Sequence, residues 1–170
     1  MTPQQATCDA LEARALRAPL RSYAVGEGLV LAGQPQPEDW QRLAEQGFRT
    51  VVNIRSDPER AAVQRAGAEE AGLRYVYAPL PAYQLEAEHL AEFARIVEQP
   101  ESRPLFVHCR SATRVALMWM LYRIVYQGWT QAEAEAELRA AGYDEDSLET
   151  FEFGAADFFE RTGPAAGGGQ

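Results

Sequence analysis

The sequence contains no lysine, and all 16 of its basic residues are arginines. A Schiff-base lysine and a lysine-containing phosphate loop are therefore excluded. Only two histidines and two cysteines are present, without the ligand spacing of a structural zinc site, so no metal and no cofactor are expected. No apolar run approaches the roughly 20 residues that a membrane-spanning helix needs.

The net charge of −9 opposes nonspecific binding to nucleic acid, which requires a basic face. An anionic substrate would have to be captured by a local group of arginines. We expect neither a nucleic-acid partner nor a membrane partner, and the sequence leaves the oligomeric state open. Cys8 and Cys109 do not form a disulfide framework, and the first residues lack the pattern of a secretory signal, so the cytoplasm is the expected compartment.

The length of 170 residues predicts one domain with three segments. Residues 1–21 are expected to form an N-terminal helical segment, with a helix over 4–16. Residues 22–162 are expected to form an α/β domain, and the glycine-rich residues 163–170 a flexible tail.

Within 22–162, strands alternate with helices, which indicates βαβ units and a parallel sheet. A hairpin is predicted first, turning through Gly26 and Gly28. The predicted fold class is α/β, with a central, mainly parallel sheet flanked by helices and a helical C-terminal end. The predicted strands are 22–28, 29–34, 49–55, 74–80 and 104–108, and the predicted helices are 37–46, 58–71, 86–98, 114–127, 131–141 and 144–161.

The most specific local feature follows the last predicted strand. That strand delivers Cys109 to the carboxyl edge of the sheet, where α/β proteins bind ligands. A tight turn follows, and Arg114 opens the next helix. Backbone N–H groups of this turn, together with the helix N-terminus and the Arg114 guanidinium, predict a concave anion site above the Cys109 sulfur.

The run His108-Cys109-Arg110-Ser111-Ala112-Thr113-Arg114 resembles the active-site loop of cysteine-dependent phosphatases. The wider sequence resembles the bacterial phosphatase-like domain called beta-lactamase-hydrolase-like. The resemblance covers about residues 30–142. It also includes Ala-Gly-Gln-Pro at 32–35, Gly-Phe-Arg-Thr-Val-Val-Asn-Ile-Arg at 47–55 and Ala-Gly-Leu-Arg-Tyr-Val at 71–76. The helix residues at 121–123 and 127–129 resemble dual-specificity phosphatases.

The resemblance implies a cysteine-phosphatase fold and the hydrolysis of phosphate monoesters through a phosphocysteine on Cys109. Arg114 and the loop amides would stabilise the transferring phosphoryl group. The phosphorylated substrate, or another small oxyanion, would be bound by the rest of the loop and by an arginine of the strand at 49–55. These substrate-binding residues are His108, Arg110, Ser111, Ala112, Thr113 and Arg55.

Three departures from the phosphatase pattern leave alternatives open. Four residues separate Cys109 from Arg114, whereas phosphatases of this class have five. The shorter loop resembles rhodanese-like sulfurtransferases, in which the cysteine carries a persulfide. Ala112 stands where the family has glycine, and Val115 where phosphatases often have a hydroxyl residue. A non-catalytic oxyanion-binding module is the third alternative.

The general acid for the leaving group is also open. The segment that corresponds to the acid loop contains no aspartate, and its nearest carboxylates are Glu86 and Glu88. Asp57 follows a parallel strand and should emerge at the same sheet edge as Cys109, so it is our candidate for the catalytic acid. An aspartate before a proline is more often a helix N-cap. His108 is expected mainly to orient the cysteine loop.

Overall fold

The computed structural model describes residues 21–166. The helix predicted over 4–16 and Cys8 lie outside the described residues. By their contacts, the described residues divide into two compact units. The first contains the residues up to Leu80 together with Gln99–Val115, and the second contains Pro81–Glu98 together with the residues from Ala116 onward.

The first unit is built on a five-stranded sheet with the order β1-β2-β5-β3-β4. β1 pairs antiparallel with β2, and every other neighbouring pair is parallel. The predicted α/β class with a mainly parallel sheet is therefore confirmed. The strands are β1 (Ser22–Ala24), β2 (Leu29–Ala32), β3 (Thr50–Asn53), β4 (Arg74–Tyr77) and β5 (Leu105–His108).

Turn residues set the limits of these strands. The predicted hairpin is present, and its turn uses Gly26 and Gly28, whose φ angles of 128° and 74° favour glycine. β4 is shorter than the predicted 74–80. The ladder ends at Tyr77, although Ala78 N–H still donates to Asn53 O at 2.9 Å and Leu80 N–H to Ile54 O at 3.0 Å. The short 3₁₀ turn at Pro100–Ser102 was not predicted.

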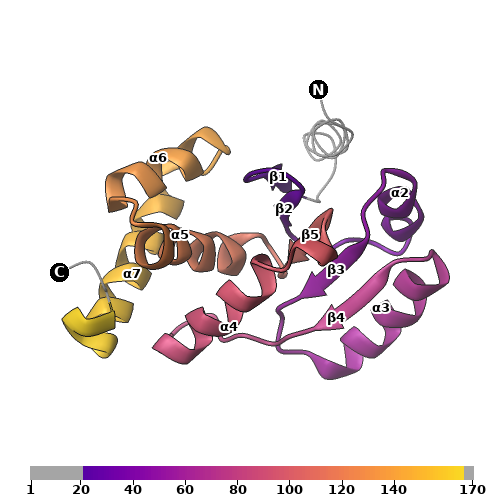
Figure 1. The fold of residues 1–170 in the computed structure, drawn as a ribbon, viewed down its shortest axis with the longest axis horizontal. Coiled ribbons are helices and arrows are strands. Elements are labelled where there is room, and N and C mark those ends of the chain that lie inside the picture. The colour runs from indigo at the N-terminus through magenta and orange to yellow at the C-terminus, as the bar shows by residue number, and fades with distance from the viewer. Residues whose placement is uncertain (1–20, 167–170) are drawn as a thin grey trace. The chain divides into compact units, whose positions relative to one another are not determined.

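Two helices, α2 (Asp39–Glu45) and α3 (Pro58–Glu70), complete the first unit, with α3 beside β4 (Figure 1). Alternate residues of a strand share a face, so the register aligns Val30, Phe106, Val51 and Tyr75 across four strands. Trp40 and Leu43 of α2 and Ala68 of α3 pack against this row in one buried cluster. This cluster packs α2 and α3 against the sheet whose carboxyl edge carries Cys109.

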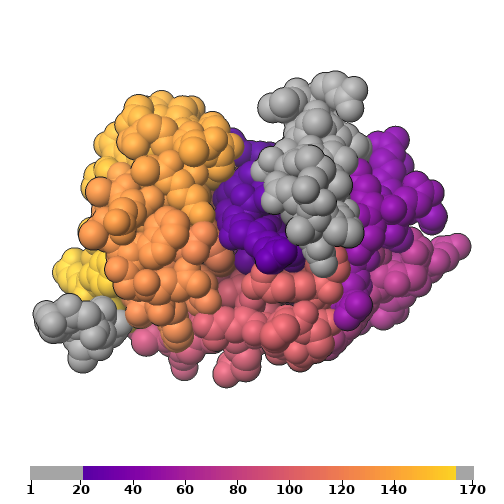
Figure 2. Space-filling view, turned by 45° about the horizontal axis from the view of Figure 1, so that its top comes forward, coloured from indigo at the N-terminus to yellow at the C-terminus, as the bar shows by residue number. Residues whose placement is uncertain are grey.

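The second unit is helical. α5 (Thr113–Gln127) starts in the first unit and continues into the second, where α4 (Ala87–Val97) and α6 (Gln131–Ala140) contribute. Thr130 caps α6 as predicted, since its hydroxyl accepts from the Glu133 N–H at 3.1 Å. α6 packs on α7 (Glu145–Ala166), and α6 is part of the orange surface in Figure 2. The backbone of α7 leaves helical geometry at Gly163.

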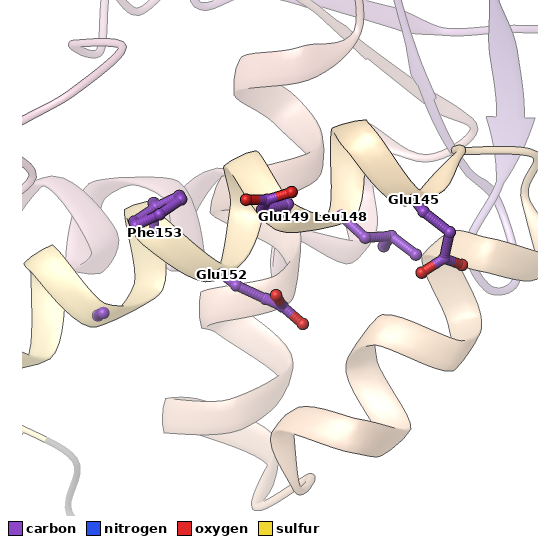
Figure 3. A pocket seen from close by; sticks show the side chains of 6 residues that line it. Glu145, Leu148, Glu149, Glu152 and Phe153 are labelled. Atoms are coloured by element: carbon purple, nitrogen blue, oxygen red, sulfur yellow. The ribbon is translucent and has the colours of Figure 1, made fainter.

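A cavity of about 510 Å³ lies along α7 (Figure 3). Its wall includes Glu145, Glu149 and Glu152 beside the exposed ring of Phe153. A hydrogen bond with the carboxyl group of Glu135 raises the pKa of Glu152, and the negative charge of Glu135 adds to this effect. Among residues 21–166, no helix is long and apolar enough to cross a membrane.

Candidate active site

Cys109 lies at the carboxyl end of β5, which is the central strand of the sheet. Its backbone N–H donates to Ala32 O at 3.1 Å, so the end of β2 fixes the position of the cysteine. Only 2% of the residue is exposed. Cys109 is therefore buried at the start of the loop that follows.

The loop after Cys109 turns sharply through Ala112. The φ angle of Ala112 is 66°, in the left-handed region, and the residue is fully buried. Ser111 and Thr113 are exposed, and their hydroxyl oxygens lie 3.2 Å apart. α5 begins at Thr113, so the partial positive charge of the helix N-terminus faces the loop. The family glycine thus corresponds to a position where this backbone needs a positive φ.

We expect Ala112→Gly to leave the free energy of unfolding nearly unchanged, within about 1 kcal/mol. Relief of the left-handed alanine favours the variant by about 1–2 kcal/mol. Loss of one buried methyl group and the greater freedom of glycine in the unfolded chain offset that gain. Ala68→Gly is the matched control, because Ala68 is equally buried but has helical geometry in α3. Urea denaturation should show a loss of about 1.5–2 kcal/mol for this control, and equal losses in the two variants would contradict the prediction.

The segment after β2 contacts the backbone of the loop that follows Cys109. Gln34 N–H donates to Arg110 O at 3.0 Å. A Cβ atom at Gly33 would lie 3.1 Å from the same Arg110 oxygen, so only glycine permits this approach without displacement. Sequence reasoning assigned no role to these residues, although they lie in the quoted Ala-Gly-Gln-Pro run. The Ala-Gly-Gln-Pro run could be noticed as a motif, but Arg110, the residue that Gln34 contacts, lies far away in the sequence.

Arg114 is anchored by the ends of two other strands. Its Nη1 donates to Ile54 O at 3.1 Å and to Leu80 O at 2.8 Å, which follow β3 and β4. Its Nε is buried and has no hydrogen-bond partner within the described part of the chain. A buried N–H group without a partner is costly. An oxyanion bound at the loop would supply an acceptor for this group.

Arg55 is held in place beside the loop. Its Nη1 donates to Gln34 Oε1 at 2.7 Å, and its backbone N–H donates to Asn53 Oδ1 at 2.8 Å. Asn53 in turn donates to the Tyr75 hydroxyl at 2.9 Å, and that hydroxyl donates to Gln64 at 3.2 Å. The Arg55 side chain is 14% exposed. Gln34 therefore connects this arginine to the backbone of the cysteine loop.

Several arginines share this edge of the sheet. Burial lowers the pKa of Arg55, and nearby charges act on it as well. The positive charges of Arg60, Arg110 and Arg114 lower this pKa further, whereas the negative charge of Asp57 raises it. The arginines are therefore close enough to repel one another, as expected for a site that receives an anion.

Asp57 caps the N-terminus of α3. Its Oδ1 accepts from the Arg60 N–H at 3.1 Å, and its Oδ2 lies 3.4 Å from Arg60 Nε and 4.0 Å from Arg55 Nη2. The structure thus shows the N-cap that the Asp-Pro sequence favours. Its role as a general acid stays a prediction.

The alternative acids lie in the second unit. Glu86 precedes α4, its N–H donates to His89 Nδ1 at 2.9 Å, and its Oε1 lies 3.6 Å from Arg161 Nη1. Glu88 is exposed in the first turn of α4. The catalytic roles of both also stay predictions.

His108 supports the loop from the protein interior. Its Nδ1 lies 3.1 Å from Cys109 O, and its ring lies near the rings of Trp40 and Phe106. Burial lowers the pKa of His108 to about 4; the Cys109 carbonyl opposes the shift and the charge of Arg55 adds to it. The imidazole is therefore neutral near pH 7, and Nδ1–H donates to the carbonyl. The orienting role of His108 stays a prediction, and this contact is the one through which it would act.

The buried His108 should make the protein less stable in acid. Between pH 6.5 and about 4 the unfolded chain carries a proton on His108 that the folded chain does not, so acidification favours unfolding. The loss begins below pH 6.5, is complete near pH 4 and amounts to about 3 kcal/mol. Urea denaturation at several pH values should show a shallower acid loss for His108→Asn than for the natural protein. Parallel curves would contradict the prediction.

A groove of about 820 Å³ adjoins the site in the first unit. It begins at Gln34 and Arg60 and continues past Trp40 and Val63 along α3. Among residues 21–166, no group of three or more histidine, cysteine, aspartate or glutamate side chains is placed to hold a metal ion.

Comparison with known proteins matches the chain to a phosphatase-like domain family. The sequence profile described as "Beta-lactamase hydrolase-like protein, phosphatase-like domain" matches residues 20–125. The beta-lactamase hydrolase-like protein of Xylella fastidiosa strain 9a5c is 28% identical over 130 residues. This match covers 74% of the chain but only 30% of the Xylella protein, so the chain spans less than a third of that relative.

Dual-specificity phosphatases form a second group of relatives. The dual specificity protein phosphatase TpbA of Pseudomonas aeruginosa strain UCBPP-PA14 is 27% identical over 139 residues, which cover 80% of the chain and 62% of TpbA. A crystal structure of P. aeruginosa TpbA has the same fold, with a TM-score of 0.59, 24% identity and coverage of 79% and 90% of the two chains. The family that the sequence resembles is confirmed by the profile match over residues 20–125. The chain belongs to the phosphatase-like domain family of the beta-lactamase hydrolase-like proteins.

Proposed function

We propose that the chain is a cysteine-dependent phosphatase that hydrolyses phosphate monoesters through a phosphocysteine on Cys109. The observation that carries this proposal is the arrangement of Arg114. Two carbonyl oxygens hold its Nη1, and its Nε is buried without a partner among the described residues. An oxyanion above the cysteine would complete this hydrogen bonding.

The proposed reaction has two displacements at phosphorus. The Cys109 thiolate attacks phosphorus, so an S–P bond forms while the bond to the ester oxygen breaks and that oxygen takes a proton. Water then attacks the phosphocysteine, the S–P bond breaks, and inorganic phosphate leaves with the thiolate restored. Arg114, the loop N–H groups and the N-terminus of α5 would hold the equatorial oxygens in both steps.

The remaining loop residues would shape the site. Ala112 supplies the turn, Ser111 and Thr113 place hydroxyl groups at its rim, and His108 fixes the carbonyl of Cys109. Arg55 and Arg110 would attract the substrate. The structure of P. aeruginosa TpbA in complex with phosphotyrosine supports a phosphorylated side chain as the substrate class.

A paired assay tests the proposal against sulfur transfer, which the short loop between Cys109 and Arg114 favours. The protein is incubated either with an aryl phosphate or with thiosulfate and cyanide. We expect phosphate release and no thiocyanate. Thiocyanate without phosphate would assign a sulfurtransferase, and neither product, together with retained phosphate binding, would assign a binding module.

The role of Asp57 is tested with leaving groups of different basicity. Asparagine keeps the oxygen that caps α3 but cannot donate a carboxylic proton. If Asp57 is the acid, Asp57→Asn lowers kcat for an alkyl phosphate by about 10²-fold or more, because this leaving group needs protonation. The rate for p-nitrophenyl phosphate then changes only a few-fold. Equal effects on the two substrates would leave Asp57 as a cap and move the search to Glu86 and Glu88.

A further inference from the structure

More arginines gather at this edge than a single phosphoryl group requires. The three equatorial oxygens of a phosphoryl group can be satisfied by the loop N–H groups and Arg114. Arg55, Arg60 and Arg110 remain, in a chain whose net charge is −9. One carboxylate, that of Asp57, is paired with two of them.

Arg55 is the most constrained of the additional arginines. Its side chain is 14% exposed, and its Nη2 lies a long 4.0 Å from the carboxylate of Asp57. Its other charged neighbours are arginines, which repel it. Keeping a largely buried cation beside other cations opposes folding unless an anion binds there. The neutral amide of Gln34 holds its Nη1 at 2.7 Å and so fixes its direction without neutralising it.

Arg110 differs from Arg55 in that its side chain is exposed to solvent. Within residues 21–166 this side chain makes no hydrogen bond or ion pair. Its backbone is fixed, because its carbonyl accepts from Gln34 N–H at 3.0 Å. Gln34 therefore contacts both arginines. Its side-chain oxygen accepts from the Arg55 guanidinium, and its backbone N–H donates to the Arg110 carbonyl. The Arg55 guanidinium and the Arg110 backbone are thus fixed by the same residue, and the charge of Arg110 is close enough to act on Arg55.

We propose that the substrate carries a second anionic group close to the phosphoryl group, and that Arg55 and Arg110 bind this second group. The proposal rests on the proposed function, because the first group must lie over Cys109. The second group is a phosphate or a carboxylate, either of which matches the planar fork of a guanidinium. Arg60, at the start of the groove along α3, adds positive charge on the same side.

Equilibrium binding to the Cys109→Ser variant tests this subsite without turnover. Calorimetry compares inorganic phosphate, pyrophosphate and phosphonoacetate, so that one anionic group is compared with two and a second phosphate with a carboxylate. We expect at least one of the two-group anions to bind at least tenfold more tightly than phosphate. The tighter of the two identifies the chemistry of the second group. Equal affinities for all three would overturn the proposal.

Second substitutions in the same background locate the subsite. Arg55→Gln and Arg110→Gln should each reduce the affinity ratio of the two-group anion to phosphate toward one. Arg74→Gln removes the same charge from the first, exposed residue of β4, at the opposite edge of the sheet, and should preserve the ratio. A ratio that survives in both site variants, or falls equally in Arg74→Gln, would overturn the proposal. Failure of the proposed function is a separate result, namely no release of phosphate from an aryl phosphate by the natural protein.

Discussion

Replacement of Cys109 by serine is expected to lower the rate of phosphate release by about 10⁴-fold or more, as loss of a catalytic nucleophile does in other covalent enzymes. Serine has nearly the size of cysteine, so the hydrogen bond from residue 109 to Ala32 and the turn at Ala112 should persist. Steady-state hydrolysis of an aryl phosphate gives the rate. The binding of inorganic phosphate to the variant should be retained.

The other cysteine of the chain supplies the matched control for this prediction. Cys8→Ser makes the same chemical change outside the cysteine loop and should keep the natural rate within a few-fold. If both variants remain active, the reaction does not pass through Cys109. If Cys109→Ser loses activity and also its cooperative unfolding transition, then the loss reports on the fold, and a Cys109→Ala variant that unfolds cooperatively decides the question.

Arg114→Lys is expected to lower kcat/KM for the same substrate by about 10²–10³-fold, the usual effect of removing one donor to a developing oxyanion. An ammonium group is a point charge and cannot hold two carbonyl oxygens with one nitrogen while another nitrogen faces the substrate. The contacts to Ile54 O and Leu80 O would compete with the phosphoryl oxygens for the same three protons. Steady-state kinetics across substrate concentrations separates kcat from KM.

Arg74→Lys controls for the general replacement of arginine in this lysine-free chain. Arg74 is exposed at the start of β4, and its substitution should change kcat/KM by less than about twofold. A similar small effect for Arg114→Lys would show that any cation suffices at this position. The forked geometry described above would then not be required for the reaction.

Local sequence signals predicted most of this fold. Glycine and proline delimit the elements, and the alternation of strands with helices places the strands in a mainly parallel sheet. The turn at Ala112 also follows from local chemistry, because a position that is glycine in the family indicates a positive φ. Strand limits were less accurate: β1, β2, β3 and β4 end at residues 24, 32, 53 and 77, whereas the predicted strands ran to 28, 34, 55 and 80.

Contacts between distant residues could not be predicted in this way. Gln34 reaches Arg55 and the backbone of Arg110, and Arg114 reaches Ile54 and Leu80. No periodicity or cap signal reports such pairs, because each depends on which strands become neighbours. For Asp57, the sequence could predict one of its two possible roles but not the other. Its N-cap role follows from the next residue, whereas a proton-donor role depends on its position relative to a substrate.

The anchoring of Arg114 also has an energetic consequence. Its guanidinium joins the loops that follow β3 and β4 to the first turn of α5, so it acts as a noncovalent cross-link between three segments. The conformational entropy of an arginine side chain, about 2 kcal/mol, is then largely lost when the chain folds and not when an anion arrives. The donor is preorganised, and the free energy of substrate binding is not spent on ordering it.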